Sequence, residues 1–321
     1  MGGGKMNFLL NFLNSCVARL FEILPRSGRQ AIFERAIKRG SIHVGYDSLC
    51  RLADNLNVVA LSVKGEYGVI QNSVSDRVIS RYYAEHGRWA VQTNNTLKDF
   101  FAATGGTYID VGANVGLTTI PVASDPRVSC LALEPEPGNF SYLAANIAAN
   151  CAHGNVVAKR IAAFERADTL RFEIAHTNFG DHRIRLRDSA GRMNEEARTI
   201  IDVEALPLDQ LVDTKRVPIA VKIDTQGAEP FVVKGARKTL AAAGLLILEF
   251  WPYGMVRMGG NPDEVIRCLE QDFATLSLVD GENHMPSPPA PCRVVVDTLR
   301  QMVKEQAGNH AFYVDCIARK A

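Results

Sequence analysis

The segment Tyr108–Thr119 reads Tyr-Ile-Asp-Val-Gly-Ala-Asn-Val-Gly-Leu-Thr-Thr and indicates the fold class. A short apolar β run carries Asp110 near its end, and a Gly-x-Asn-x-Gly turn then leads into a helical pattern. Gly112 and Gly116 allow a sharp turn and a close approach to a ligand. Free N–H groups at the start of the following helix suit an anionic ligand group. The segment therefore predicts a strand-turn-helix unit that binds a nucleotide.

Glu134 supports the same interpretation. It follows a second apolar run, in Leu133-Glu-Pro-Glu-Pro137, and lies 22 residues after Gly112. An acidic residue about 20 residues past the glycine turn hydrogen-bonds ribose hydroxyls in nucleotide-binding folds. The alternative is that Glu134 only caps a strand. We place Asn114 and Ala163 in the same predicted cofactor site.

Short apolar β runs and helical patterns alternate on both sides of this unit. The alternation predicts an α/β fold, a Rossmann-like doubly wound and mostly parallel seven-stranded sheet. An inserted strand pair, 170–174 with 199–206, interrupts it and predicts a β insertion around 164–206. The expected strands span 107–111, 128–133, 156–161, 220–223, 245–250, 275–279 and 312–317, and the expected helices 115–123, 139–150, from about 228, and 262–271.

The first part of the chain has a different pattern. We expect an N-terminal helical and β extension over 1–74 and one large domain over 75–321, whose first stretch, 75–103, is helical. Residues 6–24 form an amphipathic pattern that Pro25 ends. This helix packs on the main domain or on a second subunit as a homodimer. A membrane-surface role is less favoured, because its polar face is mostly Asn.

Composition excludes several functional classes. Lys and Arg number 36 and Asp and Glu 35, for a net charge of +1. Because the two signs balance, the chain has no overall positive field to attract a polyanion. This disfavours nucleic acid as the main partner. The seven cysteines are odd in number and show no CxxC spacing, so neither a disulfide framework nor a zinc site is indicated. The sequence has no apolar run long enough to span a bilayer. We expect a cytoplasmic protein.

A dinucleotide enzyme is the main alternative at this point. NAD-dependent oxidoreductases share the glycine turn and the acidic residue, but their turn reads Gly-x-Gly-x-x-Gly. Asp110 suits the ammonium group of S-adenosylmethionine better than a pyrophosphate. A non-catalytic nucleotide-binding relative is a further alternative.

At these residues the sequence resembles the FkbM family of class I methyltransferases. Val221-Lys-Ile-Asp-Thr-Gln-Gly-Ala-Glu-Pro230, followed by Val233-x-Gly-Ala236, is similar to the family's Lys-Ile-Asp-x-x-Gly-Ala-Glu segment. Leu246–Phe250 fits its next strand, and Thr225-Gln226 stands where Val-Glu is more usual. The likeness extends over about 75–320 and includes Asn139, Leu143, Asn146 and Asn150. It implies a class I methyltransferase fold, S-adenosyl-L-methionine as cofactor, and O-methylation of hydroxyls on sugars, polyketides or other small molecules.

The acidic residues at strand ends suggest how such a reaction would work. Asp110 and Glu134 are assigned to the cofactor, which leaves Asp224 and Glu249 for the acceptor. An alcohol is a weak nucleophile, so a general base helps. We predict Asp224 as this base, supported by Glu229. Lys222 shares its strand face and either pairs with Asp224 or stabilises negative charge. The alternatives are a structural ion pair for Lys222 and a helix-dipole contact for Glu229.

Three further features concern the acceptor. His182, in the insertion, is an alternative base, although a lone loop histidine is more often solvated. Arg183 leads an alternating arginine run that suits a phosphate or carboxylate, or else forms a solvated face. Trp251 and Tyr253 follow Glu249 and offer aromatic faces to a sugar or polyketide ring. No metal is predicted, although Asp224 could join a metal site.

Overall fold

The computed structural model describes residues 58–188, 191–193, 195–280 and 285–320, with the single positions Pro25, Gly28, Tyr46, Cys50 and Ala53. The predicted helix over 6–24 lies outside the described residues. None of the described helices is long and apolar enough to cross a membrane. The described cysteines are all free.

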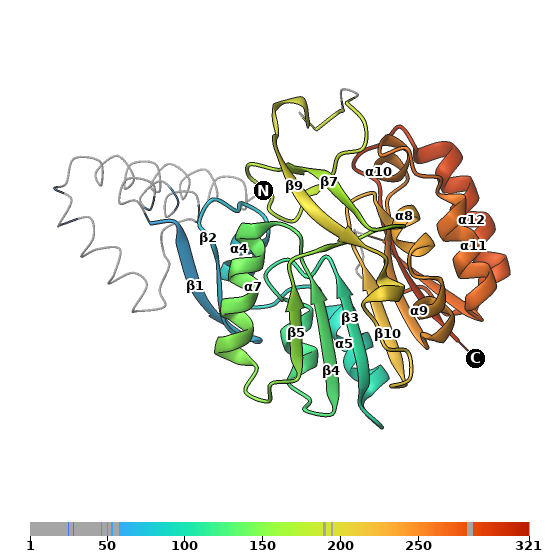
Figure 1. Cartoon of the computed structure of the whole chain (residues 1–321), viewed down its shortest axis with the longest axis horizontal. Helices are drawn as coiled ribbons and strands as arrows, with labels where there is room; N and C mark the ends of the chain where they lie inside the picture. Colours follow the sequence, from blue (N-terminus) through green and yellow to red (C-terminus); the bar gives the residue numbers. More distant parts are fainter. Residues whose placement is uncertain are drawn as a thin grey trace, which may run out of the picture.

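A twisted central sheet forms the middle layer of the molecule (Figure 1). Its strand order is β13-β12-β14-β11-β10-β3-β4-β5. All neighbours from β11 to β5 pair parallel, whereas β14 is antiparallel to both β11 and β12. The predicted doubly wound, mostly parallel sheet is therefore confirmed, and the two-residue β13 adds an eighth strand to the seven expected. The strands are β3 (Gly106–Val111), β4 (Val128–Leu133), β5 (Val156–Lys159), β10 (Ile219–Ile223), β11 (Leu245–Phe250), β12 (Thr275–Asp280), β13 (Ala290–Pro291) and β14 (Val314–Arg319).

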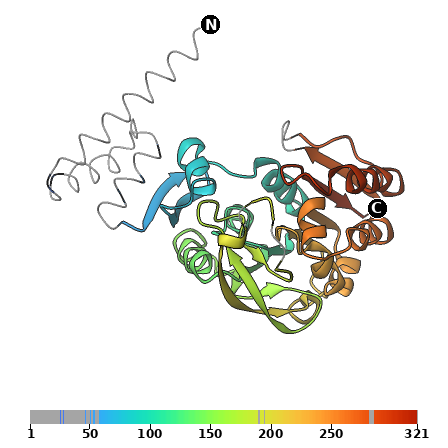
Figure 2. The same cartoon turned by 90° about the horizontal axis from the view of Figure 1, so that it is seen from above.

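Helices cover both faces of this sheet (Figure 2), because alternate strand residues point to opposite sides. Ile109 of β3 packs in the cluster that includes side chains of α8, α9, α11 and α12. Tyr108, its neighbour, packs on the other side against α5 and α6. The helices are α4 (Ile79–His86), α5 (Val91–Phe101), α6 (Thr119–Ala123), α7 (Pro137–Asn150), α8 (Glu229–Lys234), α9 (Arg237–Ala242), α10 (Pro252–Arg257), α11 (Asp263–Asp272) and α12 (Cys292–Gln306).

The predicted insertion forms a second, smaller sheet above the central one (Figure 1). Its order is β6-β9-β7-β8, and β7 pairs antiparallel with β9 along its full length. The expected strand pair is thus confirmed. The bounds are β6 (Ala162–Ala163), β7 (Asp168–Ile174), β8 (Arg183–Ile184) and β9 (Thr199–Leu206), with short 3-10 turns at Glu195–Ala197 and Leu208–Gln210.

An N-terminal hairpin, β1 (Ala60–Gly65) with β2 (Gly68–Ser73), packs beside α7. Asn146 of α7 accepts a hydrogen bond from the Gln71 N–H and donates to the Gln71 carbonyl. Asn150 bonds the backbone of Val69 in the same way. Two asparagines of the resemblance therefore hold the free edge of the hairpin. The boundary at residue 74 stays a prediction.

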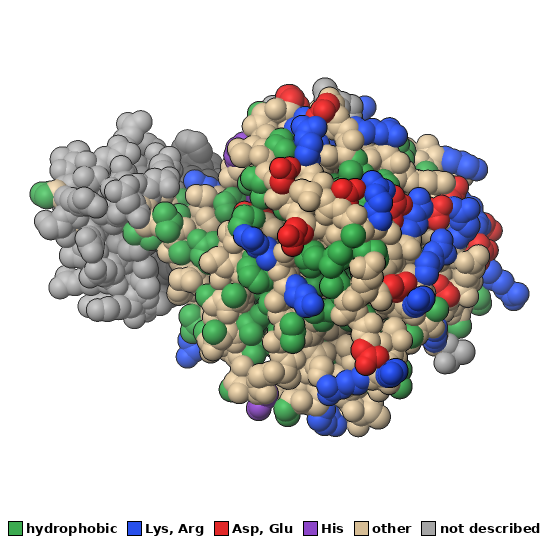
Figure 3. Space-filling model, in the orientation of Figure 1, with side chains coloured by type: hydrophobic (Ala, Val, Ile, Leu, Met, Phe, Trp, Pro, Cys, Tyr) green, Lys and Arg blue, Asp and Glu red, His purple; other side chains and the backbone are tan. Residues whose placement is uncertain are grey.

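Some elements differ from expectation. The helix expected from 115 begins at Thr119, because residues 112–118 form successive turns. Helix α12 was not predicted, since its β-branched Arg293-Val-Val-Val296 resembles a strand. Val296 and Leu299 pack in the core of the domain, and this burial outweighs local propensity. On the face shown in Figure 3, positive and negative side chains are interspersed, which agrees with the balanced composition.

Gly112 offers a test of how tightly β3 and β10 fit together. It has a φ of +82°, and a Cβ there would stand 1.9 Å from the Asp224 carbonyl oxygen. Gly154 has a φ of +65° with open space around it, so Gly154→Ala serves as the matched control. We expect Gly154→Ala to lose about 1 kcal/mol of unfolding free energy, and Gly112→Ala about 3 kcal/mol or more, from strain plus overlap. Urea denaturation measures both, and equal losses would contradict the close approach.

Candidate active site

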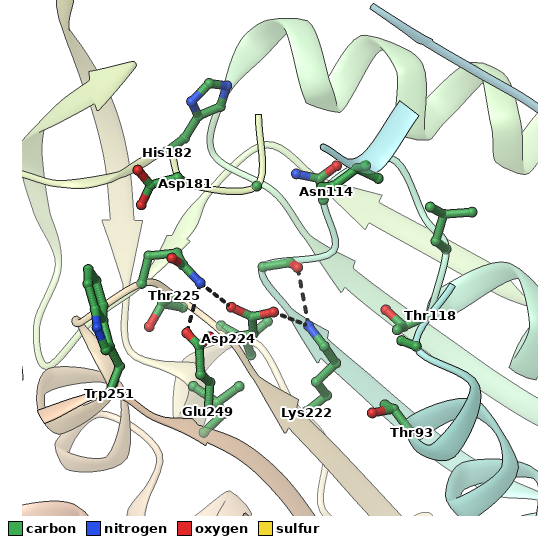
Figure 4. Close-up of a pocket in the computed structure, with 18 of the residues that line it drawn as sticks. Thr93, Asn114, Thr118, Asp181, His182, Lys222, Asp224, Thr225, Glu249 and Trp251 are labelled. Carbon is green, nitrogen blue, oxygen red and sulfur yellow. Dashed lines mark hydrogen bonds and ion pairs between the residues drawn. The ribbon is translucent and has the colours of Figure 1, made fainter. Parts of the chain in front are cut away.

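A cavity of about 790 Å³ opens at the carboxyl ends of the parallel strands. Ligands bind at this edge in open α/β sheets, and the volume is typical of a ligand pocket. Its floor comes from the ends of β3, β4, β10 and β11. The walls come from the insertion loop 178–182, the segment 78–93 and the segment 310–317. In Figure 4, Trp251 lies on one side of Asp224, and Thr93 and Thr118 lie on the other.

The glycine turn and Glu134 meet as the sequence predicted. Both Gly112 and Glu134 line the cavity, as do Asn114 and Ala163. The Glu134 carboxylate accepts hydrogen bonds from the N–H groups of Asn114 and Glu136, each at 2.9 Å. Burial raises the pKa of Glu134 to about 8, although these two bonds oppose the shift. The turn and the acidic strand end thus form one unit.

The insertion closes over this turn. The side-chain amides of Asn114 and Asn139 both donate to the Phe179 carbonyl, at 2.9 and 3.0 Å. The Phe179 N–H donates to buried Asp76, which also accepts from the first N–H groups of α4. The loop over the cavity is therefore fixed to the nucleotide turn on one side and to α4 on the other.

Two predicted cofactor residues lie behind the cavity wall. Asp110 is fully buried and accepts from the hydroxyls of Thr118 and Thr119, both at 2.7 Å. Its neighbours Thr118 and Lys222 do line the cavity, and Lys222 Nζ is 3.6 Å from Asp110. Gly116 does not line the cavity, and a Cβ there would meet the Leu143 side chain. The predicted contact of Asp110 with the ammonium group of the cofactor, directly or through water, stays a prediction.

A row of polar side chains crosses the cavity floor, and Figure 4 marks its contacts with dashed lines. Lys222 Nζ lies 3.3 Å from Asp224 Oδ2. Gln226 Nε2 donates to Asp224 at 2.9 Å and to Glu249 at 2.8 Å. The predicted pairing of Lys222 with Asp224 is confirmed. Gln226, which stands where the resemblance expects Glu, supplies a donor where a third carboxylate would repel its neighbours.

Burial and neighbouring charges shift the pKa values of two members of this row. Burial opposes the charge on Lys222, but the carboxylates of Asp224 and Asp110 outweigh it and hold its pKa above the ordinary value. Burial and the nearby Asp224 raise the pKa of Glu249 well above its usual range. Asp224 is the more exposed member, with 38% of its side chain accessible. The row therefore presents a carboxylate at Asp224 with a fixed cation and a fixed amide beside it.

Glu229 lies behind the cavity floor rather than beside a bound acceptor. It is fully buried and does not line the cavity. Its carboxylate accepts from the Thr225 N–H and hydroxyl and from the Gly227 N–H, at 2.8, 2.9 and 3.0 Å. Burial raises its pKa to about 7. Glu229 shapes the loop after β10 and thereby positions Asp224 rather than touching a ligand.

His182 and Arg183 are both buried, so the solvated alternatives are wrong for them. His182 lines the cavity and accepts the Ala175 N–H at Nδ1, and burial lowers its pKa to about 4. Arg183 does not line the cavity. Its guanidinium pairs with Glu173, Asp181 and Glu195, at 2.8, 3.1 and 3.4 Å. The expected role of Arg183 in substrate binding is corrected to a structural one, because its charge is already neutralised.

The two aromatic residues after β11 differ in whether they line the cavity. Trp251 lines the cavity, and its Nε1–H donates to the His310 carbonyl at 3.0 Å. Tyr253 is buried outside it and accepts the Arg192 N–H at its hydroxyl. The acceptor contact of Trp251 thus stays a prediction, while Tyr253 fastens the insertion to α10.

Sequence reasoning missed the contribution of β14. Asp315 lies opposite Glu249 in the antiparallel register and lines the cavity, together with His310 and Tyr313. Burial and then Asp224 raise the pKa of Asp315 to about 7. The missing signal was strand direction, because an antiparallel last strand brings its beginning to the edge where parallel strands end. Among the described residues, no group of three or more His, Cys, Asp or Glu is arranged to hold a metal.

Residues 110–271, half of the chain, match the family model described as the methyltransferase FkbM domain. The chain belongs to the FkbM methyltransferase family. The matched range contains the glycine turn, Glu134, the insertion and the Lys222–Glu249 row. It excludes the walls 78–93 and 310–317 of the cavity. The FkbM domain therefore supplies the floor of the site, and the flanking segments complete it.

A relative from Haloferax volcanii, the hexuronic acid methyltransferase AglP, is 26% identical over 167 residues, or 50% of this chain and 60% of the relative. Two solved structures are similar at lower identity. The TYW2 protein of M. jannaschii in complex with AdoMet is 12% identical, with a TM-score of 0.40 over 82% of this chain and 87% of that one. A putative O-methyltransferase from Klebsiella pneumoniae is 12% identical, with a TM-score of 0.39 over 73% and 81%. The fold assignment rests on the strand order, not on these scores.

The buried ion pairs of Arg183 predict a large effect on stability. Arg183→Met leaves Glu173, Asp181 and Glu195 with less neutralising charge, so we expect a loss of about 3–5 kcal/mol of unfolding free energy. Arg171→Met is the matched control, because the Arg171–Asp188 pair on the same small sheet is exposed, and its loss should be far smaller. Denaturant titration measures both, and comparable losses would contradict the buried network.

Proposed function

We propose that this protein transfers the methyl group of S-adenosyl-L-methionine to a hydroxyl oxygen of a sugar or another small acceptor. The observation that carries the proposal is the cavity itself. It joins the glycine turn and Glu134 to the exposed carboxylate of Asp224 within the FkbM domain. The printed activity of the Haloferax relative, on a hexuronic acid, supports a carbohydrate acceptor. Family membership argues against the NAD-dependent oxidoreductase.

The cofactor half of the cavity fits such a ligand. Glu134 would accept the ribose hydroxyls, since a carboxylate has lone pairs beyond those used by its two backbone donors. Gly112 lines the same space, and its missing side chain leaves room for the Asp224 carbonyl oxygen. Ala163 is small and lines the same space. When bound, S-adenosylmethionine supplies an electrophilic methyl carbon.

The chain's own residues prepare the acceptor. Asp224 takes the proton of the acceptor hydroxyl as the oxygen forms its new bond to carbon. Gln226 and Lys222 hold the Asp224 carboxylate in place from two sides. The insertion loop and Trp251 enclose the space and limit the entry of water. Orientation of the two reactants is the larger part of the rate, because the methyl group arrives already activated.

A first test compares cofactors and pH. S-adenosylhomocysteine should bind in calorimetric titration and NAD should not. Because the ribose hydroxyls need an ionised Glu134, whose pKa is raised to about 8, affinity should weaken as pH falls below 8, by roughly tenfold per pH unit well below it. Glu134→Gln should bind weakly and without this dependence. NAD binding alone would overturn the proposal, and a flat profile between pH 6 and 8.5 would remove Glu134 as the ribose ligand.

A second test addresses the base. Asp224→Asn should lower kcat by about 10²- to 10³-fold, the usual contribution of a general base, while S-adenosylhomocysteine affinity stays within threefold. Asp263→Asn is the control, because Asp263 lies in the first turn of α11, outside the cavity lining. Turnover is followed as S-adenosylhomocysteine release in an acceptor screen of sugars and polyketides. Unchanged turnover in Asp224→Asn, with loss in His182→Gln, would transfer the role to His182.

A further inference from the structure

The wall built by residues 78–93 lies outside the range that defines the FkbM domain. It comprises the turn into α4, the link to α5 and the first turn of α5. Thr93 of this wall lies across Asp224 from Trp251 (Figure 4). An acceptor that reaches Asp224 is therefore placed between this wall and Trp251.

Aromatic rings cover part of the wall. Tyr82 and Trp89 both line the cavity and meet edge to face, with ring centres 5.4 Å apart. Tyr82 keeps 41% of its surface exposed and stacks on His86 on its other side. The Trp89 carbonyl accepts from the Tyr67 hydroxyl and the Asn94 amide, at 2.8 and 3.0 Å. The rings are thus held in place before a ligand binds, which reduces the entropy lost on binding.

Arg88 stands beside these rings and is exposed in the cavity lining. The other cavity cation, Lys222, is already shared by Asp110 and Asp224. The lining carboxylate Asp181 is paired with Arg183 and Arg198. Within the ranges that the structure describes, no carboxylate pairs with Arg88. Its charge is therefore available to a ligand.

Another part of the cavity lining carries acidic side chains. Asp224, Glu249 and Asp315 line the cavity from three neighbouring strands, and Lys222 lies 3.3 Å from Asp224. Like charges repel at short range in a partly buried site. An anionic group on the acceptor is therefore disfavoured near Asp224 and favoured near Arg88.

We propose that Arg88, Tyr82 and Trp89 form an acceptor subsite for a sugar that carries an oxyanion, either a carboxylate or a phosphate. The guanidinium pairs with the oxyanion, and the rings contact the apolar face of the sugar. The Arg88 cation and the Asp224 carboxylate direct the oxyanion toward Arg88 and leave a ring hydroxyl facing Asp224. This assignment rests on the proposed function and adds the charge and orientation of its acceptor.

Binding, rather than turnover, tests this subsite. The full chain is saturated with S-adenosylhomocysteine and titrated with methyl β-D-glucuronide, methyl β-D-glucoside and glucose 6-phosphate. We expect at least one anionic sugar to bind about 10- to 100-fold more tightly than the glucoside, because a hydrogen bond to a charged group contributes about that much affinity. The tighter of the two anionic sugars identifies the oxyanion.

Variants then locate the effect. Arg88→Gln should remove the preference and leave glucoside affinity unchanged. Arg81→Gln, which removes an arginine paired with Glu85 on α4, should keep it. Trp89→Ala should weaken charged and neutral sugars by similar factors. Equal binding of all three sugars, or a preference that survives in Arg88→Gln, would overturn the subsite. Absence of binding by S-adenosylhomocysteine would instead overturn the proposed function.

Discussion

The close approach of Gly112 to the Asp224 carbonyl is the constraint on which the site depends. It exists because β3 and β10, more than a hundred residues apart in the chain, are neighbours in the sheet, and the Asp224 N–H continues their ladder to the Val111 carbonyl. Any side chain at residue 112 would separate the two strand ends. Because they touch, the glycine turn and the Asp224 carboxylate open into one cavity.

Lys222 offsets the negative charge of the two carboxylates near this contact. Its ammonium group lies between Asp110, behind the wall, and Asp224, at the surface of the cavity. An ammonium group between two carboxylates offsets their mutual repulsion. Burial is the chief cause of the raised pKa values of Glu249 and Asp315, although the Lys222 charge opposes the shift. Asp224 is the more exposed partner of Lys222 in this group.

The insertion contributes a rigid wall rather than a chemical group. Its buried arginines and carboxylates neutralise one another, with Arg183 also 5.1 Å from the centre of the Trp251 ring. Buried ion pairs contribute little net stability but penalise any arrangement that separates them. The insertion loop, Trp251 and α10 are therefore held in one relative position, which preserves the shape of the cavity.

The sequence by itself determined the features that depend on local geometry. The alternating strands and helices, the glycine turn, the spacing to Glu134 and the shared strand face of Lys222 and Asp224 all follow from backbone periodicity and turn chemistry. Only the tertiary structure decided that Arg183 is buried and that Asp110 and Glu229 lie outside the cavity lining. It alone also decided that Asp315 and Arg88 line the cavity. Those positions depend on which distant segments become neighbours, and side-chain burial and charge pairing are settled by that packing rather than by residue type.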